Sequence, residues 1–531
     1  RAEVAFAKNH IKDLTKITNI FVPKIINKQI DKIFVGGQIE GEFTIPFDID
    51  GNIGNNYGFS GRILDASINI TKEFHIKNLT TEINHTRDNT ANLFNITIKK
   101  GSLLDFELAD SIFRLKRENS ETDVKSLLKI NGKFNFSNVK KISSLLNLNL
   151  SNIEDIKGRG YLETNIDFKL NKKHRIKNLA YSMEGEIPYT EIYFKEKKII
   201  KKYLPDYKDA VTLKDSKIKF NKTKLNNVIE LDGFMKINNN FDSFNVKQIY
   251  DYSKRTFNIV GNIDLTNSKI NISKLNYIKD DDKKSEINFN FDFILNKYFN
   301  IKKLVFLSDK TKIDITSLKL NKNFETNDFE KLEIKTFKNG NKNNDFLVKK
   351  SNQVTISGEI FDAEPLLKSL FKKDDKKTFS KKFSSEIKIN FDKAITGTKD
   401  DVNDFGMIAT INKGSYDKLS LKGNFTENEI VEMSIYQIDN NKKTLQVISD
   451  RARPFIKNFN FIKGFEGGKL EYESIISKEV SNSNLIITDF KVSKVPALAQ
   501  LLTLASLQGI ADTLSGDGIR FESFEMKSNS K

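Results

Sequence analysis

Apolar and polar side chains alternate with a period of two over many short segments of this sequence. In the segment from Ser285 to Leu295, every second side chain is apolar and most of those between are polar. Successive residues of a β-strand point to opposite faces, so this pattern predicts strands with one apolar and one solvated face. A solvated face is typical of antiparallel sheets, because parallel sheets covered on both sides have continuous apolar runs.

The same alternation recurs along the chain. The predicted apolar faces comprise Phe43, Ile45, Phe47 and Ile49; Ile166, Phe168 and Leu170; Ile287, Phe289, Phe291, Phe293 and Leu295; and Ile387, Ile389 and Phe391. Turn sequences such as Asn339-Gly340 and Asp280-Asp281-Asp282 lie between strands. Predicted helical segments are few and cover 9–32 in part, 140–148, 363–372, 453–460 and 496–514. The predicted fold class is therefore mainly β: an elongated, curled antiparallel sheet that forms an open, repeat-like groove with a few short capping helices.

The segment Val495 to Ala511 has no charged residue, although 30% of the chain is charged. Pro496 suits a first helical turn and Gly516 and Gly518 follow the last apolar position, so the pattern predicts a helix over about 496–514. Its length and its polar residues Gln500, Gln508 and Asp512 argue against a membrane span. We expect this helix to plug or line the groove.

A strand that leads into a short helix is predicted three times, at 132–146, 358–367 and 487–502. This recurrence indicates a weak internal repeat of the kind found in stacked, quasi-one-dimensional proteins. We expect a β-rich segment 1–130 with a partly helical start, a central groove region 131–440 and a C-terminal region 441–531. These regions are expected to form one continuous elongated unit, which is a fragment of a longer protein.

The chain is basic, with 87 Lys and Arg against 70 Asp and Glu and a net charge of +17. The excess is mostly lysine spread through every segment, as an AT-rich coding sequence produces, whereas nucleic-acid binders cluster arginine and lysine with stacking aromatics. We therefore expect no nucleic-acid partner. The chain has no cysteine, which suits a periplasmic protein and excludes disulfides and thiolate-based zinc sites.

Candidate catalytic or metal-binding groups are scarce. The four histidines, His10, His75, His85 and His174, are scattered among polar neighbours and are predicted to lie on the surface. Asp48, Asp50 and Asn52 resemble the start of a calcium loop, but Ile53 and Phe59 stand where such a loop needs glycine and glutamate, so a solvated turn is favoured. We expect no catalytic residue, no metal and no cofactor, and hence a protein that is not an enzyme.

The phenylalanine-rich faces have two interpretations. They could fill a core between two packed sheets. Many such faces, with too few helices to cover them, favour instead a long sheet that curls without closing and leaves an apolar groove.

Several segments resemble a known family. Those at 261–266, 272–279, 358–367, 445–450, 464–470, 486–490, 496–502 and 514–521 are similar to the central and C-terminal regions of AsmA-like envelope proteins, of the YhdP-like branch. The matching motif positions are Gly358, Pro365, Gly467, Gly468, Pro496, Leu501, Leu502, Gly516, Gly518 and Phe521. These positions are structural in the family, so the resemblance implies no catalytic residues.

The resemblance implies a periplasmic protein of Gram-negative bacteria, anchored in the inner membrane through a segment outside this sequence. Its implied role is to carry phospholipid along a hydrophobic β-groove toward the outer membrane, in support of lipid homeostasis and the permeability barrier. The implied partners are phospholipid acyl chains, both membranes and envelope proteins. One alternative is a scaffold for outer-membrane protein assembly that acts through sheet edges. Another is an enzyme acting on an envelope glycan or lipid, which the scarcity of catalytic groups disfavours.

Overall fold

The computed structural model describes residues 1–13, 32–52, 54, 56–70, 73–87, 90–146, 150–173, 175–196, 198–369, 380–439, 442–456, 463–477, 480–494 and 518–530. The chain divides into two compact units. The first comprises residues 1–201 and 206–263, and the second 202–205 and 264–531. The boundary at 263/264 falls inside the predicted central region, and the three-region division stays a prediction.

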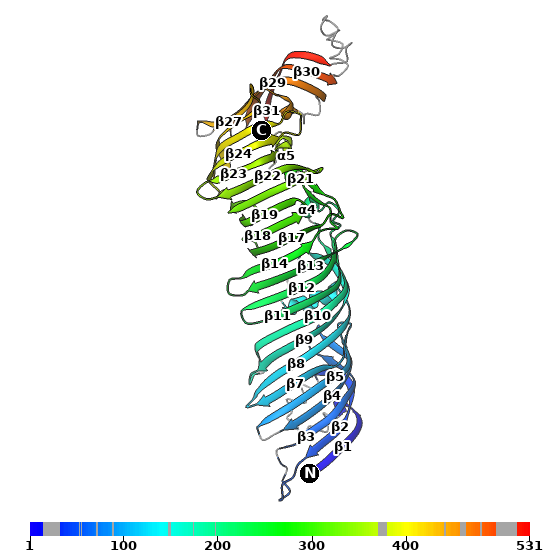
Figure 1. The fold of residues 1–531 in the computed structure, drawn as a ribbon. Helices are drawn as coiled ribbons and strands as arrows, with labels where there is room; N and C mark the ends of the chain where they lie inside the picture. Colours follow the sequence, from blue (N-terminus) through cyan, green and yellow to red (C-terminus); the bar gives the residue numbers. More distant parts are fainter. Residues whose placement is uncertain are drawn as a thin grey trace. The chain divides into compact units, whose positions relative to one another are not determined.

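The first unit is built from strands that pair antiparallel with their neighbours, largely in chain order (Figure 1). Its strands are β1 (Ala2–His10), β2 (Phe34–Ile45), β3 (Gly58–Asn69), β4 (His75–Arg87), β5 (Ala91–Leu103), β6 (Phe106–Leu108), β7 (Ser111–Glu118), β8 (Glu121–Asn135), β9 (Ile153–Leu170), β10 (Ile176–Phe194), β11 (Ala210–Lys222), β12 (Asn226–Lys236), β13 (Phe241–Asp251) and β14 (Thr256–Asp264). Helix α3 (Phe136–Leu146) lies between β8 and β9, and α4 (Lys198–Tyr203) lies between β10 and β11 in the sequence.

The second unit repeats this arrangement with shorter strands. They are β15 (Ile270–Ile272), β16 (Tyr277–Lys279), β17 (Ser285–Ile294), β18 (Tyr298–Ser308), β19 (Thr311–Asn321), β20 (Thr326–Asp328), β21 (Lys331–Lys338), β22 (Asn341–Lys350), β23 (Val354–Asp362), β24 (Ser385–Ile395), β25 (Val402–Asn412), β26 (Ser415–Thr426), β27 (Glu429–Asp439), β28 (Lys442–Ser449), β29 (Lys463–Ile476), β30 (Ser481–Lys494) and β31 (Ile519–Ser530). The helical elements are η1 (Ser273–Leu275), α5 (Glu364–Ser369) and α6 (Arg453–Ile456).

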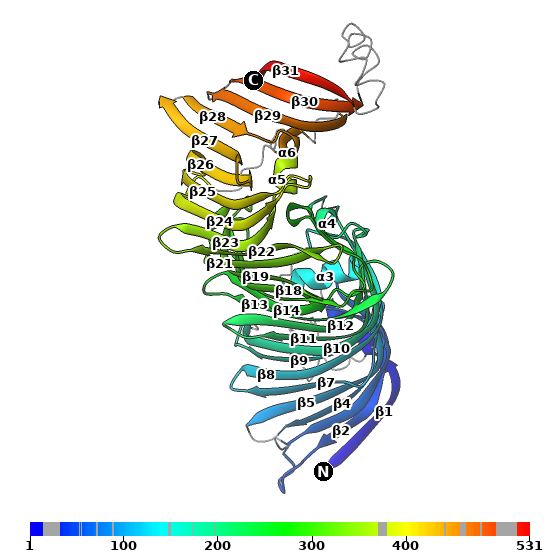
Figure 2. The ribbon, with the colours of Figure 1, turned by 45° about the horizontal axis from the view of Figure 1, so that its top comes forward.

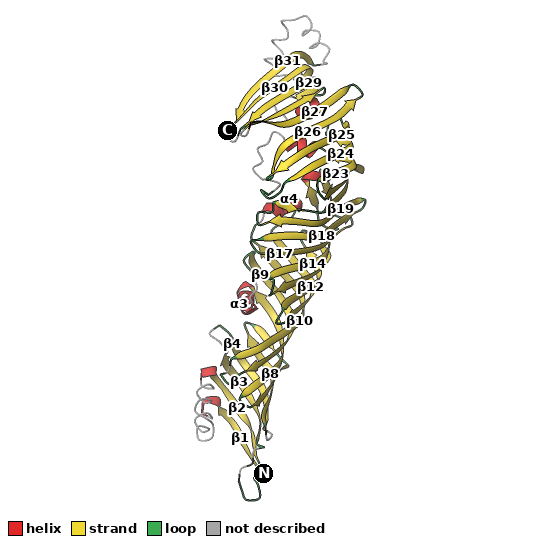
Figure 3. Ribbon diagram, turned by 90° about the vertical axis from the view of Figure 1, so that its left-hand side faces the viewer, coloured by secondary structure: helices red, strands yellow, loops and turns green. Residues whose placement is uncertain are grey.

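The predicted fold class is confirmed. Twenty-nine strands of the described part of the chain form one curled, mostly antiparallel sheet, and β15 and β16 form a separate small pair. Within each unit the strands follow a curved path (Figure 2), and the helices are short segments beside the strands (Figure 3).

Turn chemistry explains the hairpins. Asn339 and Gly340 have φ of 51° and 81° and join β21 to β22 through the pair Lys338 and Asn341, as the sequence predicts. Both central residues of a two-residue hairpin loop of this type need positive φ, which asparagine and glycine adopt at low cost.

Short polar side chains begin the helices. The Asn138 amide donates to Asn135 Oδ1 (3.1 Å) at the start of α3, and the Glu364 amide donates to Asp362 Oδ1 (3.1 Å) at the start of α5. These side chains satisfy amides that have no partner in the first helical turn.

The two strand-then-helix segments in the described residues differ in how the chain returns to the sheet. The strands on either side of α3, β8 and β9, pair antiparallel, whereas β23 and β24, on either side of α5, pair in parallel. A parallel pair needs a crossover connection rather than a hairpin. The repeat predicted from sequence is thus local and does not extend to the strand topology.

The helix predictions have mixed outcomes. Helices α3, α5 and α6 overlap predicted segments, and α4 was not predicted. In the segment 9–32, predicted to be helical in part, residues 11–13 are helical, whereas Asn9 and His10 belong to β1. Most of 9–32 and the whole helix at 496–514, with Pro496, Leu501, Leu502 and Gly516, lie outside the described residues.

Candidate functional site

An uninterrupted row of apolar side chains crosses the second unit from β17 to β31. Each member is the direct cross-strand partner of the next, so the row is defined by backbone register. We name it the apolar row; it consists of Phe289, Leu304, Ile315, Leu332, Val348, Ile356, Ile389, Met407, Leu421, Met433, Val447, Tyr472, Leu485 and Met526.

The apolar row is only partly covered. Val447 and Leu485 are buried beside Ile456 of α6, and the other members are half-buried. Met433 packs against two core clusters, one around Phe383 and the other around Val447. From Leu332 to Met526 the row is therefore continuous in packing as well as in register.

The row is wider than a single residue in its first strands. Phe291 pairs with Ile301 and Phe293 with Phe299, and the Phe289 and Phe291 rings stack at 4.9 Å between centroids. Lys302 of β18 has no register partner in β17 and forms a bulge between Ile301 and Lys303. Because of this extra residue, Ile301 before the bulge and Leu304 after it both lie opposite phenylalanines of β17.

The opposite face of the same strands is polar and carries ion pairs between strands. Lys312 of β19 contacts Glu333 of β21 at 2.9 Å, and Lys335 of β21 contacts Asp345 of β22 at 3.6 Å. Exposed pairs of this kind stabilise little individually. These ion pairs place charged side chains of β19, β21 and β22 on the face opposite the apolar row.

The first unit has a shorter row of the same kind. Its members pair in order across seven strands and are Phe43, Phe59, His85, Phe94, Leu115, Val124 and Phe168. His85, predicted to lie on the surface, is 9% exposed and its ring lies 4.4 Å from that of Phe94. A titratable imidazole thus interrupts an otherwise apolar row.

We expect His85 to make the first unit less stable in mild acid. Burial lowers its pKa from 6.5, an effect opposed by the hydrogen bond with Asn92 and assisted by Arg87. The folded state binds the His85 proton more weakly than the unfolded state does. The free energy of unfolding is therefore highest above pH 6.5, and it falls as the pH decreases through the lowered pKa of His85. Relative to intrinsic exchange rates, the protection of the β4 and β5 amides against hydrogen exchange should decrease between about pH 7.5 and pH 5. This decrease should vanish in His85→Phe; its persistence there would assign it to other groups.

Most predicted groove residues lie on strands as expected. Phe43, Ile45, Ile166, Phe168, Leu170, Ile287, Phe289, Phe291 and Phe293 alternate with polar positions in β2, β9 and β17. Ile387, Ile389 and Phe391 lie on one face of β24, where Ile387 and Phe391 are each 5% exposed and Ile389 is half-buried.

Three predicted groove residues do not lie on strands. β2 ends at Ile45, because Pro46 follows and has no amide proton to donate to a ladder. Phe47 lies beyond the strand at 44% exposure, and Ile49 is fully exposed in a turn. Leu295 follows the last residue of β17 and is 53% exposed. The prediction that these side chains line a groove is not supported by their positions.

The described motif glycines occupy places where a side chain would collide. A Cβ on Gly358 would lie 2.1 Å from the Asp345 carbonyl oxygen, at a bulge where Glu359 of β23 has no register partner in β22. Gly467 and Gly468 have φ of 69° and 79° within β29, and Gly518 has φ of 87° just before β31. Pro365 lies in α5, and the Phe521 ring stacks on Phe490 at 5.2 Å.

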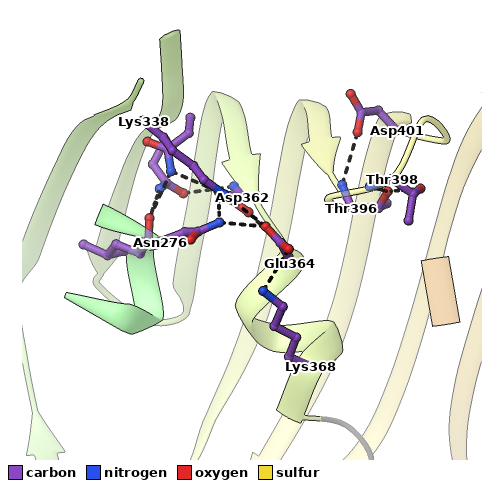
Figure 4. Close-up of polar contacts among 11 residues, drawn as sticks. Asn276, Lys338, Asp362, Glu364, Lys368, Thr396, Thr398 and Asp401 are labelled. Carbon is purple, nitrogen blue, oxygen red and sulfur yellow. Dashed lines mark hydrogen bonds and ion pairs between the residues drawn. The ribbon is translucent and has the colours of Figure 1, made fainter. Parts of the chain in front are cut away.

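A buried polar cluster fixes the start of α5 (Figure 4). Asp362 Oδ2 accepts hydrogen bonds from Asn276 (2.9 Å) and Asn343 (3.0 Å). Burial raises the pKa of Glu364, but hydrogen bonds from Lys368, Lys338 and Asn276 outweigh it and lower this pKa to about 2. Glu364 is therefore ionised, and the two carboxylates connect α5 to η1, β21 and β22 through these hydrogen bonds.

The calcium-like segment is a turn that its own side chain closes. The Asp48 carboxylate accepts hydrogen bonds from the amides of Asp50 (3.0 Å) and Asn52 (2.7 Å), and the Asn52 hydrogen bonds lower the Asp48 pKa. Among the described residues, no group of three or more His, Cys, Asp or Glu side chains is placed to hold a metal ion. In that same part of the chain no helix is long and apolar enough to cross a bilayer.

Sequence reasoning missed most of the apolar row. Met407, Met433, Tyr472 and Met526 lie in strands whose alternation is weak or interrupted by bulges, so they did not stand out. The signal that could have found them is the apolar residue at every second position within each strand. The register that joins the strands cannot be read from a single sequence.

Comparisons of this chain with protein-family models, with curated proteins and with solved structures found no match.

Proposed function

We propose that this protein is a non-enzymatic conduit that carries phospholipid along the apolar faces of its sheet. The apolar row supports this proposal, because it is continuous over fourteen strands and most of it is only half-buried. A row that served only as a core would be expected to be covered along its length.

The energetics match a lipid cargo. Exposing the roughly 30 methylenes of a diacyl lipid to water costs about 25 kcal/mol, at about 0.8 kcal/mol for each. A strip of phenylalanine, isoleucine, leucine and methionine side chains offsets much of this cost at every position along the row. No bond is made or broken, so the process needs no catalytic group.

The resemblance to AsmA-like envelope proteins gives the proposal its cellular setting. The lipid would cross the periplasm and supply the outer membrane. The inner-membrane anchor would be a segment that this sequence does not cover. The rival proposal is an assembly scaffold that binds client strands at sheet edges. It draws on β31, which pairs with β30 along one edge and has no partner for its other edge among the described residues.

Photo-crosslinking separates these proposals. A photoreactive residue is placed at Phe289, Phe291 or Phe293 on the apolar face of β17, or at Asn288 or Asn290 on its opposite face. After illumination in cells, mass spectrometry should find phospholipid adducts at the three phenylalanine positions and few at the asparagine positions. Equal adducts on both faces, or no lipid adduct, would contradict the conduit. Client-protein adducts along β31 would favour the scaffold.

A further inference from the structure

Part of the apolar row lines a partly open cavity. Its volume is about 250 Å³, and no charged side chain lines it. The floor is formed by Leu332, Val348, Ile356, Ile389 and Met407 of the apolar row, and Phe329 and Phe383 form part of the wall. These five row members are half-buried, as most of the row is, so the cavity is distinguished by the Phe329 and Phe383 side chains that also line it.

The wall of the cavity is fixed in position. Phe383 is 1% exposed and its ring lies 6.3 Å from that of Phe329. The Phe383 carbonyl accepts a hydrogen bond from the Gly414 amide (2.9 Å), and the Ser380 amide donates to the Thr326 carbonyl (3.1 Å). These bonds hold the wall segment to β20 and to the turn between β25 and β26. Backbone hydrogen bonds therefore hold Phe383 in its position beside the cavity.

One lysine lies beside this wall, and a second binds the same carboxylate as the first. The Lys350 ammonium lies 5.2 Å from the centre of the Phe383 ring and forms an ion pair with Asp328. Lys319 pairs with the same carboxylate at 3.2 Å. Two cations thus share one anion, which leaves a net positive charge next to an apolar cavity. Phospholipids with an anionic headgroup have the complementary arrangement, a negative group attached to an alkyl chain.

We infer that this cavity is a resting site for one acyl chain of an anionic phospholipid, with the headgroup phosphate at Lys319 and Lys350. The inference rests on the proposed function and adds a specific position and lipid class to it. The size fits a single chain end: cavities of about 150 Å³ lined by similar side chains bind benzene. A second acyl chain would lie outside the cavity on the open part of the row.

Filling the cavity tests the acyl-chain part of the inference. The fluorescent fatty acid cis-parinaric acid is titrated into the purified chain. Val348→Trp should weaken its binding at least about tenfold, because one methylene group in a tight apolar pocket already changes affinity by that order. Leu347→Trp is the matched control on the opposite face of β22 and should bind as the wild type does.

A second pair of variants guards against misfolding. Ile389→Trp fills the cavity from β24, and Lys388→Trp changes the opposite face of the same strand. All four variants are compared by circular dichroism and thermal unfolding. Wild-type binding by both folded cavity-filling variants would overturn the inference. Tryptophan keeps the row apolar, so the lipid adducts at Phe289, Phe291 and Phe293 should persist in these variants.

The headgroup part is tested with vesicles. Lipid extraction from phosphatidylglycerol vesicles is compared with extraction from phosphatidylcholine vesicles, and the wild type should prefer the former. Lys319→Met with Lys350→Met should remove this preference, whereas the exposed Lys349→Met should keep it. An unchanged preference in the double variant would overturn the assignment of the phosphate. Absence of lipid adducts from the phenylalanine positions of the wild type would instead contradict the proposed function itself.

Discussion

Replacing Met407 by aspartate is expected to stop lipid transfer while leaving the chain folded. Met407 is half-buried in the middle of the apolar row, between Ile389 and Leu421. An alkyl chain that passes this position would strip water from the new carboxylate, which costs several kcal/mol. Because each 1.4 kcal/mol changes an equilibrium about tenfold, transfer between donor and acceptor vesicles should fall by more than about tenfold.

The neighbouring residue provides a matched control. Ile408 is 64% exposed on the opposite face of β25, so Ile408→Asp introduces the same charge one position away. This variant should transfer lipid at the wild-type rate. Equal rates for a folded Met407→Asp and the wild type would mean that lipid does not use this face. Equal loss in both variants would indicate a general defect in the protein.

Replacing Lys279 by methionine is expected to cause a large loss of stability in the second unit. Lys279 is 1% exposed, and its ammonium donates to the backbone carbonyls of Leu265 (2.9 Å), Thr266 (2.8 Å), Ser268 (2.8 Å) and Asp280 (3.0 Å). Methionine preserves the length of the side chain but leaves these acceptors without their donor. A buried acceptor without a partner costs about 1–3 kcal/mol, so the loss should exceed about 3 kcal/mol.

Urea unfolding and hydrogen exchange at β15 and β16 measure this effect. Lys274→Met, at an exposed position of η1, is the control and should change the free energy of unfolding by less than about 0.5 kcal/mol. If Lys279→Met were as stable as the control, the four hydrogen bonds would contribute nothing net, and the loop from Leu265 to Ser268 would be held by other contacts.

Local features of the fold could be predicted from the sequence because they depend on neighbouring residues. Alternation at Ile287, Phe289, Phe291 and Phe293 predicted a strand face, and Asn339-Gly340 predicted a hairpin. The same rule failed at Ile49, because alternation continues in the sequence past Pro46 although the strand cannot. A period of two is thus a necessary but not sufficient sign of a strand.

The features that could not be predicted depend on register or on distant partners. Ile356 is joined to Ile389 in the apolar row because β23 and β24 pair in parallel. No local sequence pattern predicts this pairing. Lys279 precedes three aspartates and was included in no predicted core, yet its backbone partners bury it. Lys350 acquires its place beside the cavity from Phe383, a residue more than thirty positions away.

The neighbour-to-neighbour pairing of the strands also bears on how such a chain changes in length. Each hairpin contacts mainly the strands before and after it, so stability is close to a sum of nearest-neighbour terms. Gain or loss of a whole hairpin would keep the inward and outward faces in phase, whereas insertion of a single strand residue would reverse them. Duplication of hairpins is therefore an accessible evolutionary route by which a sheet of this kind can change its length.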